Sequence, residues 1–449
     1  MSTSIHIKRG LDLKLKGAVT DNAIISCPAA SAAVEPIDFP GFVPKLTVKE
    51  SDSVEVGSPL LCDKNHPDVC LTSPLAGKVA KIERGERRRI VRVVIEASKD
   101  QTYVTYSTAE ARQGNPEAIR LLLQQSGMWA MMRQLPYDIV PKYDIVPANI
   151  FVSAFNSAPL APDYSILLAD KAKELQAGAD ALTKLTPGKI YYSTRPGTAV
   201  PVPHGVEHVE IYGPHPAGLP SIQADNLAPV NKGESVLLLD AVTLARIGEL
   251  LLTDKTDWQC VIALCGSEVE APRYVSTCAG AALSPILQGD VKNDNCHHRI
   301  IAGSVLTGVN AGENGYLHFP YQQVTVIPEG DDVDEFMGWA SLSPNKMSVN
   351  RSFLSALLPG KKFAPDARLL GGRRAMIMSG QYDKVLPMDI LPEYLIKAIL
   401  ARDIDKMEQL GIYEVTPADF ALCEYIDPSK LELQKIVREG LDYLRKELE

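Results

Sequence analysis

Residues 61–79 have the sequence LCDKNHPDVCLTSPLAGKV. An Asp63-Lys64 pair at a turn is followed by a run of proline and small residues, from Ser73 to Gly77, that leads into a second apolar segment. Turn residues between two short apolar runs are typical of a β-hairpin. We therefore predict a small all-β domain here, with a lysine at the tip of one hairpin.

The other parts of the first hundred residues support that prediction. Short alternating runs, such as LTVKE (46–50), VAKIERG (79–85) and IVRVVIEAS (90–98), are separated by turn residues. A period of two residues is typical of half-buried strands. Residues 1–100 resemble the barrel-sandwich fold of biotinyl and lipoyl domains.

Carrier domains of that fold attach biotin or lipoate to a lysine at the hairpin tip. Here the tip, residues 63–68, is broad and contains the rigid Pro67, and Lys64 lies nine residues before Ser73, where about seven is usual in lipoyl domains. The Met-Lys-Met signature of biotin carriers is also missing. We expect an unmodified structural domain. A carrier is the alternative, and it predicts a mass increment on Lys64.

From about Glu110 the pattern becomes an alternation of helices and strands. Apolar residues recur at helical spacing in 116–135 and 165–185, and short apolar runs occupy 148–155, 189–194 and 235–240. Such alternation predicts a parallel sheet with crossover helices. Residues 101–256 are therefore predicted to form a Rossmann-like α/β domain.

The remaining chain is predicted to contain a β-grasp unit followed by a helical region. Residues 257–330 are rich in strands, with one short helix at about 281–288, and residues 331–449 are mainly helical. Thr416-Pro417 and Asp427-Pro428 each combine a polar cap with a first-turn proline, the pattern of a helix start. The fold class is thus a multidomain protein of α/β and all-β units.

Charge and hydropathy exclude several functional classes. The net charge of -9 and the pI near 5.5 argue against a nucleic-acid surface, which needs clustered lysine and arginine. The N-terminus lacks the apolar core of a signal peptide, and no segment has the roughly 18 apolar residues that span a bilayer. We expect a soluble cytoplasmic chain that reaches a membrane only through partner subunits.

The eight cysteines include no CxxC pair, which is the spacing that zinc and iron-sulfur sites use. We interpret them as reduced structural thiols. The densest metal-like cluster is Cys296-His297-His298, whose adjacent side chains would point to opposite faces of a strand. We therefore predict no metal site and no catalytic residue.

Two stretches have the chemistry of a quinone site, which needs flat apolar walls and one or two donors to the ring carbonyls. The first contains Trp129, Arg133, Pro136 and Tyr137. The second, DFPGFVP (38–44), contains Phe39 and Phe42. The alternative is that these side chains fill the core.

A third candidate is the segment GPHPAGLP (213–220), which includes Gly213, His215 and Gly218. It follows an apolar strand, so a phosphate-binding or flavin-binding loop is conceivable. However, it matches neither GxGxxG nor a P-loop, and it lacks a lysine. A rigid turn is the alternative, and the role of the loop stays open.

Several segments together resemble one family, NqrA, which supplies the A subunit of the Na⁺-translocating NADH:quinone oxidoreductase. They are spread from the first ten residues to the last helix, although no single segment is a catalytic signature. The matching segments are 7–17, 72–79, 82–88, 126–138, 150–161, 213–218, 302–308, 347–354, 382–390 and 422–430.

This resemblance implies a peripheral subunit, on the cytoplasmic side of the bacterial inner membrane, of a six-subunit complex that oxidises NADH, reduces ubiquinone or menaquinone and pumps Na⁺. FAD, FMN, riboflavin and a [2Fe-2S] centre belong to partner subunits. Quinone and the membrane-embedded B subunit are the implied ligand and partner. The C subunit of the related Rnf complex carries cysteine runs for iron-sulfur clusters, whereas Cys423 here stands alone, with Asp427 at the position of a possible second cysteine.

We therefore expect an accessory subunit that binds no cofactor covalently, is not catalytic alone and helps to form or cover the quinone site. It would be part of an enzyme of the translocase class. One alternative is a purely structural subunit for assembly, and the other is an Rnf-like electron-transfer subunit. Asn156 departs from the family pattern, in which an acidic residue is common at this position.

Overall fold

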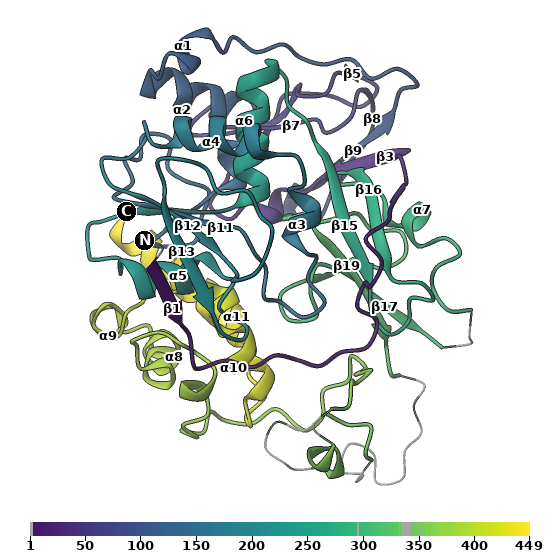
Figure 1. Cartoon of the computed structure of the whole chain (residues 1–449), viewed down its shortest axis with the longest axis vertical. Helices are drawn as coiled ribbons and strands as arrows, with labels where there is room; N and C mark the ends of the chain where they lie inside the picture. Colours follow the sequence, from purple (N-terminus) through teal and green to yellow (C-terminus); the bar gives the residue numbers. More distant parts are fainter. Residues whose placement is uncertain are drawn as a thin grey trace.

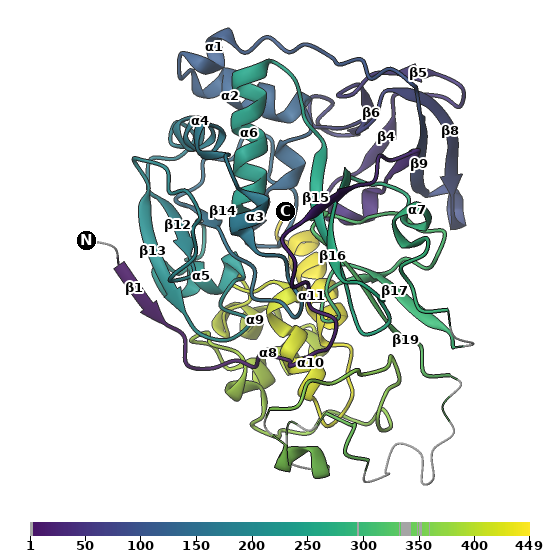
Figure 2. The same ribbon diagram turned by 45° about the vertical axis from the view of Figure 1, so that its right-hand side comes forward.

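The computed structural model describes residues 3–293, 296–331, 333, 343–347, 349, 353–358 and 360–449. Four residues of the family-like segment 347–354 lie outside these ranges. The chain folds into an N-terminal β unit, an α/β unit, a second sheet and a group of C-terminal helices (Figure 1). Figure 2 shows that the C-terminal helices lie below and between the α/β unit and the second sheet.

The N-terminal β unit consists of two small antiparallel sheets. One has the order β3 (Ser31–Val34), β9 (Ile90–Ala97), β8 (Gly77–Arg84), β5 (Ser53–Val54). The other has the order β4 (Pro44–Leu46), β6 (Pro59–Asp63), β7 (Cys70–Thr72). Leu60 and Leu61 of the second sheet and Val93 and Ile95 of the first are completely buried in one apolar cluster. The short 3-10 helices are η1 (Pro36–Asp38) and η2 (Glu86–Arg88).

β6 and β7 are the two arms of the hairpin predicted from residues 61–79, and Lys64 lies exposed at its tip. Cys62 and Cys70 face each other across these strands and form a disulfide. The expectation that all eight cysteines are thiols was therefore wrong for this pair. The reason is the strand register, which places the two side chains opposite each other and which cysteine spacing alone does not indicate.

The α/β unit is built on a six-stranded sheet in which β10 alone is antiparallel to its neighbour. The strands, in spatial order, are β1 (Thr3–His6), β13 (Glu207–Tyr212), β12 (Ile190–Thr194), β11 (Ile150–Ser153), β14 (Val236–Asp240) and β10 (Arg133–Leu135). The helices are α1 (Ala109–Arg112), α2 (Pro116–Gln125), η3 (Trp129–Met131), α3 (Tyr164–Leu167), α4 (Ala172–Leu182), α5 (Pro220–Leu227) and α6 (Ala241–Thr253).

Two of the helices predicted in this unit are shorter than expected. Helix α2 ends at Gln125 because Gly127 adopts a left-handed backbone with φ of 84°, and the following Met and Trp residues form a 3-10 turn and a strand. The helix predicted over 165–185 is divided into α3 and α4, and the break contains Asp170 with φ of 59°. Helical periodicity continues across both breaks, so the pattern alone does not reveal them.

The N-terminal segment crosses between units. β1 pairs in parallel with β13, and β2 (Ile24–Ser26) pairs with β16 of the second sheet. Figure 2 shows this segment running from the α/β unit across the lower part of the molecule to the second sheet. The first 26 residues therefore join two other units before the chain enters the N-terminal β unit.

The second sheet has the strand order β18-β17-β19-β15-β16-β2. Its other strands are β15 (Gln259–Cys265), β16 (Arg273–Cys278), β17 (His298–Ala302), β18 (Val309–Asn310) and β19 (Gln323–Pro328). One short helix, α7 (Leu283–Leu287), lies within the predicted range of 281–288. This sheet shares its buried core with the N-terminal β unit and with part of the α/β unit.

The C-terminal region contains η5 (Leu354–Leu357), η6 (Tyr382–Lys384), α8 (Pro392–Ala401), α9 (Ile404–Gln409), η7 (Pro417–Phe420), α10 (Ala421–Ile426) and α11 (Leu433–Leu448). The helix start predicted at Thr416 is confirmed: Thr416 and Asp419 form a capping box. The start predicted at Asp427 was wrong, because α11 begins six residues later. The Asp427 carboxylate instead accepts hydrogen bonds from the amides of Ser429 (3.1 Å) and Leu431 (2.8 Å), closing a turn after α10.

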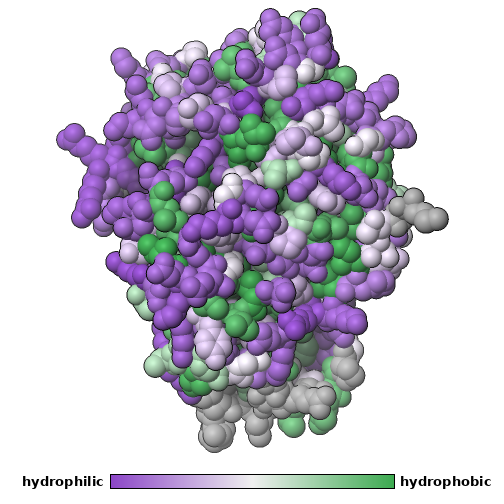
Figure 3. Space-filling model, turned by 90° about the vertical axis from the view of Figure 1, so that its left-hand side faces the viewer, coloured by the Kyte–Doolittle hydropathy of each residue, from purple (hydrophilic) through white to green (hydrophobic). Residues whose placement is uncertain are grey.

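Among the described residues, no helix is both long and apolar enough to cross a lipid bilayer. One face of the molecule is shown in Figure 3, where hydrophilic side chains predominate and apolar ones gather in small, separate groups.

The contact between α5 and the C-terminal region should make stability depend on pH. Burial, together with the charge of Glu414, raises the pKa of Asp225 to about 7, and Asp419 adds to this effect. Above the ordinary pKa of an aspartate, the folded state holds a proton that the unfolded chain has released, so stability falls as pH rises towards the folded pKa. We expect the free energy of unfolding to decrease between roughly pH 4 and pH 7.

Asp225→Asn should make this decrease smaller without removing it, because burial also raises the pKa of Asp419 to about 7. The variant should be more stable than the unmodified chain at the higher pH by about 1 kcal/mol. Urea unfolding at several pH values measures the effect, with the exposed Asp100→Asn as the matched control. Equal pH dependence in Asp225→Asn and the unmodified chain would contradict the assignment.

Candidate functional site

Two of the predicted site residues, Phe39 and Arg133, come together in the structure. Phe39 follows η1 and is buried, and the Arg133 guanidinium lies 6.0 Å from its ring centroid and 4.8 Å from that of Phe319. Arg133 also donates hydrogen bonds to the carbonyls of Asp38 (2.5 Å) and Ala130 (3.0 Å). A third hydrogen bond goes to the Met132 carbonyl at 3.2 Å. The cation is thus held between two aromatic rings and three carbonyls, and it joins three separate segments of the chain.

The adjacent Asp38 carboxylate connects the N-terminal β unit to residues 318–319. One oxygen of Asp38 lies 2.7 Å from His318 Nδ1, and the other accepts the Phe319 amide at 3.0 Å. Glu35 is 3.7 Å from the other nitrogen of His318. Burial lowers the pKa of His318, but the hydrogen bond and charge of Asp38 outweigh it, so the net shift is upward. The folded chain therefore favours the protonated form of His318, which lies buried between the carboxylates of Asp38 and Glu35.

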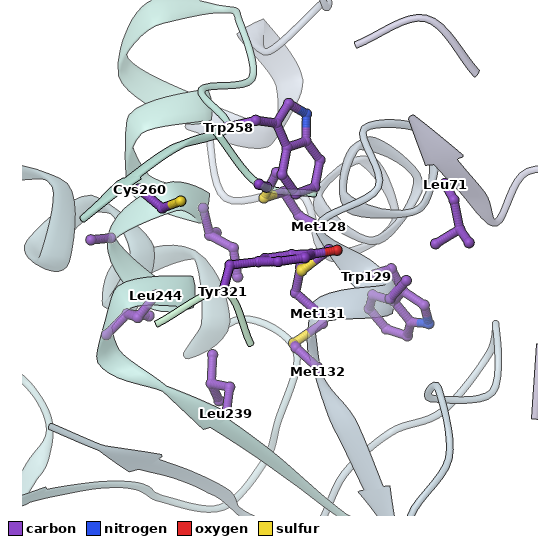
Figure 4. Packing of buried hydrophobic residues seen from close by; sticks show 14 of the residues in the cluster. Leu71, Met128, Trp129, Met131, Met132, Leu239, Leu244, Trp258, Cys260 and Tyr321 are labelled. Carbon is purple, nitrogen blue, oxygen red and sulfur yellow. The ribbon is translucent and has the colours of Figure 1, made fainter. Parts of the chain in front are cut away.

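Apolar side chains close the space behind Phe39. A void of only about 10 Å³ remains between Phe39, Met131, Trp258 and Tyr321. Figure 4 shows Tyr321 surrounded by the methionines of 128–132, with Trp258 above it. A ligand pocket normally measures roughly 300–1,000 Å³. In this conformation, the cluster around Phe39 and Arg133 does not admit an aromatic ring.

The other candidates of that stretch lie elsewhere. Trp129 is 1% exposed and donates its indole N–H to the Pro141 carbonyl at 2.8 Å, as a core tryptophan does. Pro136 follows a cis peptide bond, and Tyr137 packs in the apolar cluster of the C-terminal helices. The Tyr137 carbonyl accepts a hydrogen bond from Arg438 of α11 at 2.6 Å. The structure therefore divides the predicted quinone-site residues among different environments.

Phe42 reaches an open cavity of about 170 Å³, which we call the hairpin pocket. It lies between the hairpin tip and the loop 139–144, and its wall includes a stacked pair, His66 and Tyr143, with ring centroids 3.9 Å apart. Lys142 and Arg445 are at its edge, and both contact Glu449, at 2.8 and 3.1 Å. Flat rings and cationic donors thus meet at one opening. Sequence spacing did not identify His66 and Tyr143, which lie 77 residues apart.

The loop of Gly213, His215 and Gly218 follows β13 at the carboxyl edge of the α/β sheet. His215 Nδ1 is 3.0 Å from the Ser157 hydroxyl, and burial lowers the His215 pKa to about 4. The Gly218 amide donates to the same hydroxyl at 2.8 Å, and a Cβ at Gly218 would lie 2.5 Å from the Ser157 amide nitrogen. The loop is therefore packed tightly against the segment that follows β11.

His298 is the first residue of β17, and Cys296 and His297 directly precede this strand. In the part of the chain that the structure describes, no group of three or more histidine, cysteine or acidic side chains is placed to hold a metal ion.

The contact between Asp38 and residues 318–319 yields a test of stability. Asp38→Ala should lower the free energy of unfolding by about 2–4 kcal/mol, because it leaves the buried His318 and the Phe319 amide without their acceptor. Thermal and urea unfolding measure the loss. Asp100→Ala, at an exposed loop position, should change stability very little. A similar, small effect of both substitutions would show that the Asp38 contacts do not hold these segments together.

Comparison with protein-family models divides the chain into three matching regions. Residues 5–98 match the NqrA N-terminal barrel-sandwich hybrid domain, residues 115–256 match the NqrA second alpha/beta domain, and residues 261–313 match the NQRA C-terminal domain. The barrel-sandwich prediction for the N-terminal unit is confirmed, and so is the α/β class of the second unit.

Curated relatives are similar over nearly their whole length. The chain is 35% identical to the A subunit of the Na(+)-translocating NADH-quinone reductase of Neisseria meningitidis serogroup B, over 99% of this chain and 100% of the relative. The protein of the same name from Rhodopirellula baltica is 35% identical over 98% of both chains, and that from Saccharophagus degradans is 36% identical over 99% and 100%.

Among solved structures, an NAD⁺-reducing [NiFe]-hydrogenase in the H2-reduced state aligns with a TM-score of 0.38 and 12% identity, covering 76% of this chain and 63% of that one. Nothing is inferred from so low a score. The full-length identity to the curated relatives is decisive, and the chain belongs to the NqrA family, the A subunits of the Na⁺-translocating NADH-quinone reductases.

Proposed function

We propose that this chain is the accessory A subunit of an NADH-quinone reductase that transports Na⁺, and that it forms or covers part of the quinone site without transferring electrons itself. The observation that supports this function is the 35% identity to named A subunits over 99% of the chain. FAD, FMN, riboflavin and the [2Fe-2S] centre would belong to partner subunits. The membrane-embedded B subunit would hold the chain on the cytoplasmic side of the bacterial inner membrane.

We place the quinone-facing surface at the hairpin pocket. Phe42 is the predicted residue that reaches an open cavity, and the His66–Tyr143 stack supplies the flat wall that a quinone ring requires. Lys142 and Arg445 provide N–H donors for a ring carbonyl. A cavity of about 170 Å³ accommodates a headgroup but not a prenyl tail, so the tail would extend towards a partner subunit. In this proposal the quinone site lies at a joint between subunits.

We also propose a doubly wound, Rossmann-like topology for the α/β unit, within the boundaries 101–256. In the order β13-β12-β11-β14, strands β12 and β13 are added on one side of β11, and β14 is added on the other side. Doubly wound folds bind their ligand at the point where the strand order changes direction in this way, here between β11 and β14. Here Gln322 crosses from the second sheet to this point. It accepts a hydrogen bond from Tyr164 at 3.0 Å and donates one to Asp240. The crevice is thus occupied by the chain itself, which supports an accessory subunit rather than a dinucleotide-binding one.

The β-grasp assignment of residues 257–330 and the boundaries 1–100 and 331–449 belong to the same proposal. The family model for the third region supports the β-grasp assignment, since it describes an NQRA domain of the SLBB type over residues 261–313.

A purely structural role is the second candidate, and the closed cluster around Phe39 and Arg133 favours it. The two roles predict different effects of substitutions. If the chain forms part of the quinone site, some variants should impair quinone reduction in a normally assembled complex, whereas a purely structural role predicts no such variants. Reconstituting the complex with variants of this chain separates them.

Omitting the chain from the reconstituted complex should abolish NADH-driven quinone reduction while electron transfer from NADH to ferricyanide continues, because the flavins of the partner subunits do not need this chain. Membrane vesicles assayed with both acceptors measure the difference. Unchanged quinone reduction without the chain would refute the proposed function.

Tyr143→Ala should raise the KM for quinone by about tenfold, because it removes one wall of the hairpin pocket and half of the aromatic stack. Val146→Ala, three residues further along and 62% exposed, is the matched control. If assembly is normal and both variants have the KM of the unmodified complex, the quinone does not bind at this pocket and a structural role is favoured.

A further inference from the structure

Arg246 is a buried cation on helix α6. Only 6% of the residue is exposed, and its guanidinium lies 6.0 Å from the ring centroid of Trp258. Nη2 donates to the Gln259 carbonyl at 3.2 Å, whereas the buried Nε has no hydrogen-bond partner among the described residues. One aromatic ring and one carbonyl do not neutralise a buried positive charge, which normally requires an anion.

The carboxylates near Arg246 are bound to other groups. Asp240 caps α6 by accepting the Thr243 amide at 2.7 Å, and Asp257 accepts the Gln259 amide at 2.8 Å. Glu249 contacts Lys171 at 3.1 Å. Within the described part of the chain, no acidic side chain forms an ion pair with the Arg246 guanidinium. The fold therefore brings the cation into its interior and leaves it without a counter-ion in direct contact.

The neighbouring thiol does not provide the missing negative charge. Burial raises the pKa of Cys260 to about 12, although Arg246 lowers it, so Cys260 stays protonated near neutral pH. Figure 4 shows the Cys260 side chain close to Trp258 and Tyr321, in the apolar wall beside this position. The thiol acts as a weakly polar part of that wall.

Arg246 lines a cavity of about 210 Å³ between the α/β unit and the second sheet, which we call the seam pocket. Val242 and Ala245 of α6, Leu168 before α4 and Val261 of β15 form apolar walls. The charged lining besides Arg246 is Lys171, Glu249 and Asp257; Glu249 pairs with Lys171, and Asp257 accepts the Gln259 amide. The volume is several times the roughly 30 Å³ that one water molecule occupies in the liquid. It is sufficient for a phosphate or a short carboxylic acid.

We propose that the seam pocket binds a small oxyanion, a carboxylate or a phosphate, through the guanidinium of Arg246. The planar fork of arginine matches two oxygens of either group. The charge of Lys171 is balanced by Glu249 and Glu174, so the attraction for the anion comes from Arg246. The ligand would link α6 to β15, and so tie the α/β unit to the second sheet. The site is separate from the hairpin pocket and does not depend on the proposed quinone function.

Calorimetric titration of the full chain with inorganic phosphate and with succinate, at constant ionic strength set by chloride, tests the site and distinguishes the two ligand classes. At least one of them should bind saturably and raise the melting temperature. Arg246→Gln should weaken that binding by about tenfold or more, the loss expected for a charged hydrogen bond. Arg195→Gln, at an exposed position on another segment, should bind as the unmodified chain does.

Val261→Phe fills the pocket without removing the cation, so it should also reduce binding, and it serves as the test if Arg246→Gln does not fold. Absence of saturable binding by the unmodified chain would overturn the proposal. Binding that survives both Arg246→Gln and Val261→Phe would overturn it too, because the anion would then bind elsewhere. Loss of binding in Arg246→Gln and Val261→Phe, but not in Arg195→Gln, supports the site.

Discussion

The contact between Asp38 and the segment 318–323 determines how the units of this protein fit together. A single carboxylate holds both the His318 ring and the Phe319 amide. Because these residues are fixed, the following Tyr321 enters the shared core and Gln322 reaches Asp240 at the end of β14. One short segment thus contacts the N-terminal β unit, the second sheet and the α/β unit.

This arrangement explains why the candidate ligand sites lie between units rather than inside one. The space at the carboxyl ends of β11 and β14 is occupied by Gln322 and Tyr164. The hairpin pocket and the seam pocket instead border segments from different units: the hairpin pocket lies between residues 63–69, 139–144 and α11, and the seam pocket lies between α6 and β15. Side chains from two units meet at each of these joints, so a ligand bound there would contact both units.

Sequence patterns predicted helices and strands well where the residues that decide the structure are neighbours in the chain. The hairpin of 61–79, the strands at 150–153 and 190–194 and the cap at Thr416 follow from periodicity and turn chemistry. The wrong predictions concern features that depend on strand pairing or on the backbone conformation of a single residue. The Cys62–Cys70 disulfide depends on strand register, and the end of α2 depends on a left-handed Gly127. The parallel pairing of β1 with β13 joins residues about two hundred positions apart, and no local pattern shows it.

The candidate site depends even more on contacts between distant residues, which sequence patterns do not reveal. Sequence chemistry suggested Phe39 and Arg133 as quinone-site candidates in two separate stretches. It could not show that the two side chains meet, or that Phe319 completes their cluster and closes it. Aromatic and methionine residues suit a quinone site and a core equally well, since both uses rest on apolar contact. What distinguishes them is free volume, about 10 Å³ at Phe39 against about 170 Å³ at Phe42. Because volume depends on residues hundreds of positions apart, only the folded chain separates the two phenylalanines.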